Sequence, residues 1–212
     1  MHKATHKVLD VIPLSEHTFV LEIERAGVEF KAGQCMNIGV PKTGINREYS
    51  SYSGESEPTL KFLIREVGGG QVTPRLRQLR PGDEVELDGA YGDFVIPSVG
   101  KQSFTFIASG TGIAPFHSFV KSIPDLEYRI IHGVRSGRED YDRSDYKDYV
   151  CCSSRDELGD YSGRVTDYIS DDTVDFSSKF YLCGNRNMIC EVYDKLRQHG
   201  VGGDQIITET FF

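Results

Sequence analysis

Residues 104–115 read FTFIASGTGIAP, an apolar run that ends in Gly110-Thr111-Gly112 and leads into a stretch with helical character. An apolar strand followed by Gly-x-Gly and a helix is the local order that a dinucleotide-binding site requires, because glycines let the backbone approach phosphates closely. The third glycine of the usual fingerprint is missing, and Pro115 stands in its place. The stretch therefore favours an α/β fold with a nucleotide at this turn, and a plain tight turn is the alternative.

The chain after this stretch alternates short apolar runs with helix-like segments. Strands are predicted at 104–108, 128–134, 149–152, 180–183 and 206–207, and helices at 114–123, 164–169 and 187–199. In the last helix the apolar residues expected on one face are Met188, Val192, Tyr193 and Leu196. This order predicts a parallel sheet with helices on both faces.

The chain before Pro97-Ser98-Val99-Gly100 has a β pattern instead. Phe19, Leu21 and Ile23 alternate with Val20, Glu22 and Glu24, a period of two residues. Other short strands are predicted at 8–12, 35–40, 60–64 and 85–87, with Gly, Pro and Ser between them. Short strands separated by turns predict a small antiparallel barrel. We therefore expect two domains, residues 1–98 and residues 101–212.

The segment Arg47-Glu48-Tyr49-Ser50 places several side chains that could bind a ligand on one predicted strand. Residues two apart on a strand point to the same side, so Arg47 and Tyr49 share a face. An arginine fork can hold a diphosphate, an aromatic ring can stack on a planar ligand, and the Ser50 hydroxyl can meet a ring nitrogen. An edge strand with an exposed arginine and packed tyrosines is the alternative, and on spacing alone it is the better one.

Gly68-Gly69-Gly70-Gln71-Val72-Thr73 precedes a predicted short helix that continues from Pro74 to Leu79. Thr73 fits the N-cap of this helix and Pro74 its first position. Glycines together with a helix start can receive a phosphate, and a flexible hairpin loop is the alternative.

Residues 181–188, YLCGNRNM, again join a strand to a helix through a glycine. Cys183 is expected at the carboxyl end of its strand, where parallel sheets bind ligands. A cysteine of the core would look the same, and taken alone it is the better interpretation.

Composition narrows the class of protein. The 212 residues include 24 Lys+Arg and 32 Asp+Glu, a net charge of −8, which argues against nucleic acid as a main partner. No stretch approaches the roughly 20 apolar residues of a membrane helix, so no membrane partner is expected. The five cysteines are an odd number without a disulfide framework, which indicates a reducing compartment, the cytoplasm by default. The histidines show no metal-binding pattern, and no metal is expected.

Taken together, the four segments resemble the ferredoxin–NADP(+) reductase family in order and spacing, from about Gly33-Gln34 to the C-terminus. The resemblance implies an α+β two-domain fold, an antiparallel β-barrel that holds FAD followed by an α/β Rossmann-like parallel-sheet domain for NADP(H). It implies hydride transfer between NADP(H) and FAD and single-electron transfer to ferredoxin or flavodoxin, by a cytoplasmic monomer. The residues by themselves leave FAD and FMN open.

The resemblance also implies roles for residues of the first half. Arg47 would bind the flavin diphosphate, Tyr49 would stack on the isoalloxazine and Ser50 would lie near the reactive nitrogen. The diphosphate would also meet backbone amides of the segment Gly70, Gln71, Val72 and Thr73.

In the second half, the same resemblance implies a site for the nicotinamide nucleotide. Its loop would comprise Gly110, Thr111 and Gly112, and Cys183 would lie by the nicotinamide ring in the motif completed by Gly184, Asn185 and Met188. The 2′-phosphate of NADP would be held by Ser154, Arg155 and Arg164, with Arg135 as a third arginine. Some of these arginines could instead pair with the acidic residues at 139–148. Glu209 would help supply protons, and Phe211 or Phe212 would cover the flavin.

Other features leave further alternatives. Arg186 stands where the family usually has proline. Five basic residues against one acidic residue predict a patch that steers an acidic carrier; they are Lys61, Arg65, Arg75, Arg77 and Arg80, against Glu66. A flavin reductase, or the flavin subunit of a larger oxidoreductase, is one alternative function. A non-enzymatic nucleotide-sensing module is another, and thiol regulation through Cys151-Cys152 is a remote third.

Overall fold

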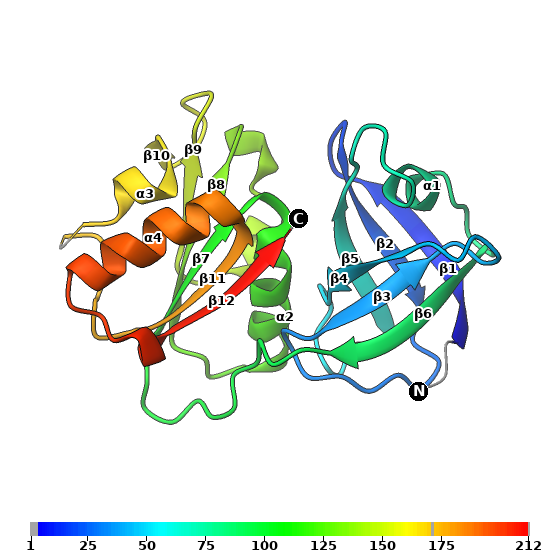
Figure 1. Ribbon diagram of the computed structural model, residues 1–212, viewed down its shortest axis with the longest axis horizontal. Helices are drawn as coiled ribbons and strands as arrows, with labels where there is room; N and C mark the ends of the chain where they lie inside the picture. The colour runs from blue at the N-terminus through cyan, green and yellow to red at the C-terminus, as the bar shows by residue number, and fades with distance from the viewer. Residues whose placement is uncertain (1–3, 171, 212) are drawn as a thin grey trace. The chain divides into compact units, whose positions relative to one another are not determined.

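The computed structural model describes residues 4–170 and 172–211, and their backbone divides into two units. One unit comprises the chain up to Ile96 together with Ala114–Ser122, and the other comprises Pro97–Ile113 and the chain from Ile123 onward. The boundary near Ile96 coincides with the change of sequence pattern at Pro97. Each unit has its own sheet and its own hydrophobic core (Figure 1).

The first unit is built on an antiparallel six-stranded sheet in the order β4-β3-β6-β1-β2-β5. Its elements are β1 (Ala4–Pro13), β2 (Thr18–Glu24), β3 (Cys35–Gly39), β4 (Asn46–Ser50), β5 (Thr59–Arg65), α1 (Thr73–Arg77) and β6 (Glu84–Tyr91). Beyond β4 the Tyr52 amide donates to the Lys61 carbonyl of β5 at 2.8 Å, which joins the two ends of the sheet order. The sheet therefore closes on itself, and the antiparallel barrel that the sequence predicts is confirmed.

The barrel core follows from the period-two pattern. Phe19, Leu21 and Ile23 of β2 are each fully buried, as the alternation predicts. Met36, Phe62 and other apolar side chains meet them in one cluster. Burial of each large side chain contributes roughly 1.5–3 kcal/mol, so the barrel has its own source of stability.

Helix α1 begins differently from the prediction. Val72, not Thr73, is the N-cap residue, and no side chain caps the helix, so Pro74 takes the second helical position. The Thr73 hydroxyl instead accepts a hydrogen bond from the Val67 amide at 2.9 Å. The prediction failed because the hydroxyl has a partner in the preceding loop, which it pins to the helix start.

Helix α2 (Ala114–Ser122) groups with the barrel, although the sequence analysis placed it in the second domain. Phe116 and Phe119 pack on Phe94, with ring centroids 6.0 and 6.1 Å apart respectively. The Ser118 hydroxyl donates to the Ser53 carbonyl at 2.7 Å. These contacts give α2 an aromatic and polar attachment to the first unit that residue patterning cannot show.

The second unit is built on a parallel six-stranded sheet in the order β10-β9-β8-β7-β11-β12. Its strands are β7 (Phe104–Ser109), β8 (Tyr128–Val134), β9 (Tyr149–Ser153), β10 (Tyr161–Ser162), β11 (Lys179–Asn185) and β12 (Ile206–Phe211). Its helices are α3 (Val165–Tyr168) and α4 (Arg186–Gln198), with the 3₁₀ turns η1 (Gly110–Ile113), η2 (Gly137–Glu139), η3 (Arg143–Asp145) and η4 (Gly203–Gln205). The parallel sheet is confirmed.

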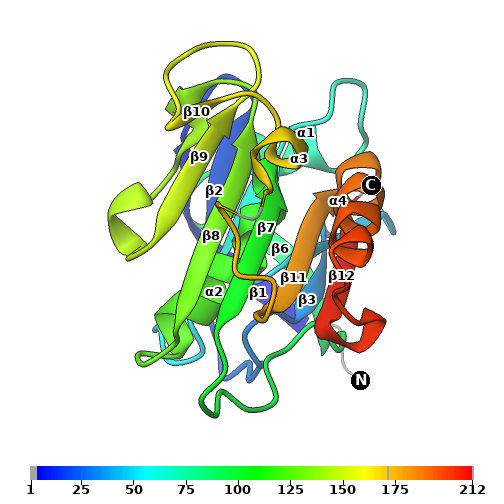
Figure 2. The same ribbon diagram turned by 90° about the vertical axis from the view of Figure 1, so that its left-hand side faces the viewer.

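Helices α3 and α4 cover one face of this sheet (Figure 2). Met188, Ile189, Val192 and Leu196 of α4 are buried in the core of the unit. Tyr193 is 36% exposed, so its predicted place on the buried face is wrong. At about 100° per residue Tyr193 lies roughly 40° beyond Ile189, at the edge of the buried stripe.

No helix in the described part of the chain combines the length and apolar character needed to cross a membrane.

Candidate functional site

The β4 segment of the first unit presents Arg47 and Tyr49 on one strand, paired with Ile38 and Met36 of β3. Arg47 is exposed, and its guanidinium donates to the Asn46 carbonyl at 2.6 Å. Tyr49 packs against the barrel core, and its buried hydroxyl has no hydrogen-bond partner in the described residues. Burial raises the pKa of Tyr49, so the phenol keeps its proton and needs an acceptor. A bound ligand with an oxygen here would satisfy it.

The glycine loop after β5 leads directly into α1. The Gly70 amide donates to the Val67 carbonyl at 2.9 Å, and Thr73 holds the Val67 amide, so the loop is folded back on itself. Among the described residues the amides of Gln71 and Val72 have no acceptor. The Thr73 amide belongs to the first helical turn, where N–H groups lack intrahelical partners. Such a run of free donors fits a diphosphate, and with Tyr49 the first unit fits a flavin dinucleotide.

In the second unit the loop after β7 touches the end of β11. A Cβ on Gly112 would lie against the Cys183 carbonyl oxygen and 2.7 Å from Gly184 Cα. Gly184, with φ +131°, would in turn meet the Ser109 carbonyl oxygen at 2.7 Å. The Asn185 amide donates to the Ser109 hydroxyl at 2.9 Å. The structure therefore brings together Gly112 and Gly184, which the sequence analysis found in separate motifs.

The residues of the YLCGNRNM motif have distinct environments. Cys183 is fully buried in β11 beside Glu209 of β12, and burial together with Glu209 raises the pKa of its thiol well above the usual value. Cys183 is therefore a neutral thiol. Asn185 caps α4 by accepting from the Asn187 amide at 3.0 Å, so α4 begins at Arg186 without the proline usual in the family. Met188 packs in the core.

Arginines gather where three neighbouring strands end. Arg135 follows β8, Ser154 and Arg155 follow β9, and Arg164 follows β10. The Arg155 amide donates to the Arg135 carbonyl at 2.9 Å, and the Ser154 hydroxyl donates to the Val134 carbonyl. All three arginines are exposed, and within the described residues none forms an ion pair with a carboxylate. The neighbouring Arg143 differs, because it pairs with Asp160 and Asp140.

His132 is the site residue that sequence reasoning missed. It is 1% exposed, and its Nε2 lies 2.8 Å from the Gly110 carbonyl oxygen while its Nδ1 lies 2.8 Å from the Tyr149 hydroxyl. Burial lowers the pKa of His132 to about 4, so the ring is neutral near pH 7. The available signal was positional, because Ala108 pairs with His132 in the sheet, two residues before Gly110.

The remaining predicted residues divide between the units. Ser50, at the end of β4, is buried in the first unit, whereas Cys183 and Glu209 lie in the second. Phe211 is the last residue of β12, and Phe212 lies outside the described residues.

The predicted basic patch carries less free charge than its composition suggests. The Arg77 guanidinium pairs with Glu66 at 3.2 Å, donates to the Ser15 carbonyl and lies over the Phe19 ring. Lys61 lies 3.7 Å from Glu57. Arg77 is thus a structural residue, and the exposed arginines of the patch are Arg75 and Arg80.

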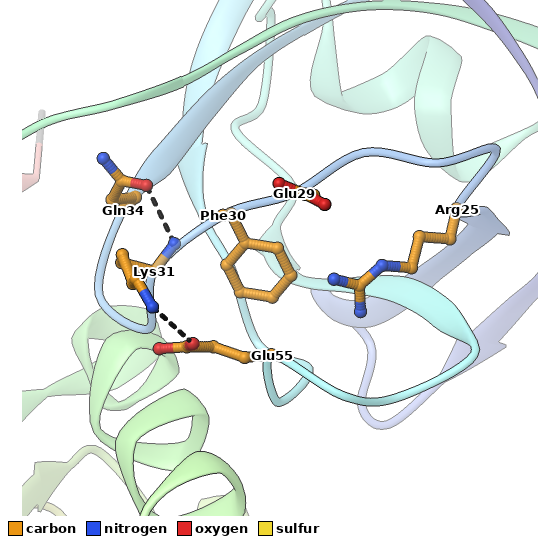
Figure 3. Close-up of a pocket in the computed structure, with 6 residues that line it drawn as sticks. All are labelled: Arg25, Glu29, Phe30, Lys31, Gln34 and Glu55. Carbon is orange, nitrogen blue, oxygen red and sulfur yellow. Dashed lines mark hydrogen bonds and ion pairs between the residues drawn. The ribbon is translucent and has the colours of Figure 1, made fainter.

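A pocket of the first unit lies outside these motifs (Figure 3). It is lined by Arg25, Glu29, Phe30, Lys31, Gln34 and Glu55. The Arg25 guanidinium donates to the Glu57 carbonyl at 2.8 Å and lies over the Phe30 ring, and Lys31 pairs with Glu55. Its cations are engaged in holding the loop between β2 and β3, so the pocket is a weaker candidate for a ligand than the β4 face.

The two vicinal cysteines are buried strand residues. Cys151 and Cys152 are fully buried in β9, and burial raises the pKa of Cys151 to about 11 and that of Cys152 to about 12. Thiol chemistry needs the thiolate, so neither is suited to redox regulation.

Comparison with known proteins finds a matching family for the first unit. Residues 11–96 match the family described as "Oxidoreductase FAD-binding domain". Most of the first unit is therefore similar to an oxidoreductase FAD-binding domain.

Two relatives match this chain over more than half of its length. The chain is 28% identical to the toluate 1,2-dioxygenase electron transfer component of Pseudomonas putida, over 96% of this chain and 66% of that protein. It is 33% identical to the flavodoxin/ferredoxin–NADP reductase of Escherichia coli (strain K12), over 58% of this chain and 51% of that protein. The chain thus spans between about half and two thirds of the length of these relatives.

Solved structures agree on the fold. A cytochrome P450 reductase of Amycolatopsis aligns with a TM-score of 0.88 at 26% identity, covering 99% of this chain and 70% of that one. A ferredoxin NADP+ reductase from Neisseria gonorrhoeae, with bound FAD and NADP, aligns with a TM-score of 0.89 at 23% identity over the full length of both chains. The two-domain fold of this chain is that of these reductases.

Proposed function

We propose that this chain is an FAD-dependent reductase that takes electrons from NADPH and passes them singly to a ferredoxin or flavodoxin. The observation that carries the proposal is the match of residues 11–96 to an oxidoreductase FAD-binding domain, together with a parallel sheet whose strand ends hold three arginines that form no ion pair within the described residues. When bound, FAD accepts a hydride and releases single electrons. The chain's own residues supply binding, orientation and exclusion of water.

On the flavin side, we assign Arg47, Ser50 and the amides from Gln71 to Thr73 to the cofactor. The exposed Arg47 guanidinium offers a fork to a diphosphate, and the Tyr49 hydroxyl needs an acceptor that the described residues do not provide. Ser50 lies at the buried end of β4, where a ring would rest against the barrel. These donors fix the flavin so that little reorganisation is needed when it reacts.

On the nucleotide side, we assign Gly110, Thr111 and Gly112 to the dinucleotide and Arg155, Arg164 and Arg135 to a 2′-phosphate. A hydrogen bond to a charged group contributes roughly 1.5–3 kcal/mol, so two such arginines favour NADPH over NADH by about 10²–10⁴-fold. Because Cys183 is a neutral buried thiol, its proposed role is to pack beside the nicotinamide, with Gly184 and Asn185 shaping the loop. The role assigned to Glu209 is to supply protons.

A second candidate differs in the electron acceptor. The relatives that match most of this chain are reductase components of oxygenase systems, such as the propane 2-monooxygenase reductase of Rhodococcus jostii at 28% identity over 89% of this chain. In that case the acceptor is an oxygenase component or its iron–sulfur partner. Free flavin as acceptor, and nucleotide sensing without turnover, are the remaining alternatives.

Turnover with defined acceptors separates these functions. The FAD-loaded chain is assayed with NADPH and either a [2Fe–2S] ferredoxin, a flavodoxin or free FMN at matched concentrations. We expect saturable reduction of a protein carrier and slower reduction of FMN. Faster reduction of FMN than of every carrier would favour the flavin reductase, and FAD that neither NADPH nor NADH reduces would favour the sensing module.

A further inference from the structure

A buried histidine connects the glycine loop of the second unit to the sheet below it. A carbonyl oxygen can only accept, so the 2.8 Å contact between His132 Nε2 and the Gly110 oxygen requires the proton on Nε2. Nδ1 then has a lone pair, and it accepts the Tyr149 hydroxyl at 2.8 Å. The two contacts together fix one neutral tautomer of His132.

Tyr149 is itself held by a second set of contacts. Its ring stacks on that of Tyr146, with centroids 5.1 Å apart. The Arg143 guanidinium also lies over the Tyr149 ring, 5.3 Å from its centroid. The Arg143 guanidinium makes two hydrogen bonds to the Asp160 carboxylate, at 2.9 and 2.8 Å. Asp160 also accepts the Cys151 amide at 2.8 Å, which attaches this cluster to β9.

The orientation of one peptide plane follows from the histidine contact. In a planar trans peptide the C=O and the next N–H point in opposite directions. Because the Gly110 carbonyl is turned toward His132, the Thr111 amide of the same peptide points away from His132. Gly110 has φ +55°, a left-handed conformation that glycine adopts without strain.

We propose that His132 and Tyr149 are positioning residues that hold the Gly110 carbonyl inward and thereby aim the loop's amides at the phosphates of the dinucleotide. The proposal deepens the proposed function and rests on it. His132 touches neither cofactor nor substrate in this account, and it acts only through the backbone of the loop.

Two substitutions of the same residue separate its two contacts. The side-chain amide of Gln can reach the position of Nε2, whereas that of Asn reaches only the position of Nδ1. His132→Gln therefore keeps a donor for Gly110, and His132→Asn keeps only the contact to Tyr149. Tyr149→Phe removes the hydroxyl that selects the tautomer. His199→Gln, at an exposed histidine of the same unit, is the control.

The first readout is binding of two ligands. We expect His132→Asn to raise KM for NADPH about tenfold, the value of roughly one hydrogen bond, while His132→Gln and His199→Gln stay within about threefold of wild type. Binding of 2′-AMP, which carries the 2′-phosphate but neither phosphate of the dinucleotide diphosphate, should not change in any variant. Equal effects of Asn and Gln on KM would overturn the proposal.

The second readout needs no cofactor. Amide hydrogen exchange at residues 110–113 of the apoprotein should quicken in His132→Asn and in Tyr149→Phe, and remain near wild type in His132→Gln. Unchanged exchange in His132→Asn would overturn the proposal even in an active enzyme. If wild-type protein fails to bind NADPH, the proposed function fails, and the exchange result still decides whether His132 anchors the loop.

Discussion

Arg155 and Arg164 carry positive charges that no carboxylate of the described chain neutralises. If they hold a 2′-phosphate, Arg155→Ala and Arg164→Ala should each raise KM for NADPH about 10–100-fold and leave KM for NADH unchanged. Steady-state kinetics with both nucleotides measures this. Arg138→Ala, at an exposed arginine of η2 in the connection between β8 and β9, is the matched control. A parallel change with NADPH and NADH would contradict the assignment.

His132 also links folding stability to pH. Its pKa falls to about 4 in the folded chain, below the ordinary value of 6.5, because burial disfavours the charged ring. The unfolded chain therefore binds more protons between these values, and stability is lost as pH falls from about 6.5 toward 4. From pH 7 to pH 5 this single group lowers the free energy of unfolding by roughly 2 kcal/mol.

The comparison of wild type with His132→Gln isolates that contribution. Urea denaturation at pH 7 and at pH 5 should give a smaller acid loss of stability in the variant than in wild type, because glutamine does not titrate in this range. The facing groups that share the site, the Tyr149 hydroxyl and the Gly110 carbonyl, do not titrate there either. An identical pH dependence in the two proteins would show that the ring is not buried in its neutral form.

Among the elements, the contact between the β7 loop and β11 depends on the absence of a side chain. Gly112→Ala places a methyl group against the Cys183 carbonyl, which has no flexible side chain to give way. We expect a loss of about 1–3 kcal/mol of stability in the second unit and weaker NADPH binding, with FAD affinity unchanged. Calorimetry and a flavin titration measure these effects.

Gly110→Ala is the control for Gly112→Ala, because it adds a methyl group without a close contact. A Cβ at Gly110 meets nothing within 4 Å, so its cost comes only from the left-handed φ of +55°, about 1–2 kcal/mol. A Gly112→Ala protein that is as stable as wild type and binds NADPH normally would contradict the close approach of these two segments.

The elements also show what residue patterns can and cannot predict. Period-two alternation located β2 through Phe19, Leu21 and Ile23, since burial on one face of a strand leaves a direct mark on the sequence. The glycine turn after β7 was predicted because strand, Gly-x-Gly and helix are contiguous. Long-range partners leave no such mark, so the roles of Thr73 toward Val67 and of Arg77 toward Glu66 were missed.

The same reason explains why the role of His132 was missed. Its partners, Gly110 and Tyr149, lie 22 and 17 residues away and come together only when β7, β8 and β9 pair in the sheet. Arg135 and Arg155 each follow a predicted strand, whereas Arg164 was indicated only by the family resemblance. The sequence could not show whether these arginines pair with the acidic residues nearby. In the described part of the chain, Asp160 and Asp140 pair with Arg143 instead.

For the whole molecule, net charge and local charge act in opposite directions on an acidic partner. The chain carries −8 overall, and Arg75 and Arg80 are exposed near the glycine loop of the flavin unit. Arg75→Glu with Arg80→Glu should lower kcat/KM for an acidic carrier and flatten its salt dependence, because steering acts on encounter. The rate of flavin reduction by NADPH should not change. Unaltered carrier kinetics at low salt would count against steering by these residues.

The central claim is that this chain holds FAD and reduces it with NADPH. Anaerobic mixing of the FAD-loaded protein with NADPH, and separately with NADH, followed at the visible flavin band, tests it most directly. We predict bleaching by NADPH at least about 100-fold more efficiently than by NADH, from the arginines that follow β9 and β10. Equal bleaching by both nucleotides would remove the 2′-phosphate assignment, and a protein that does not take up FAD, or whose FAD neither nucleotide reduces, would contradict the central claim.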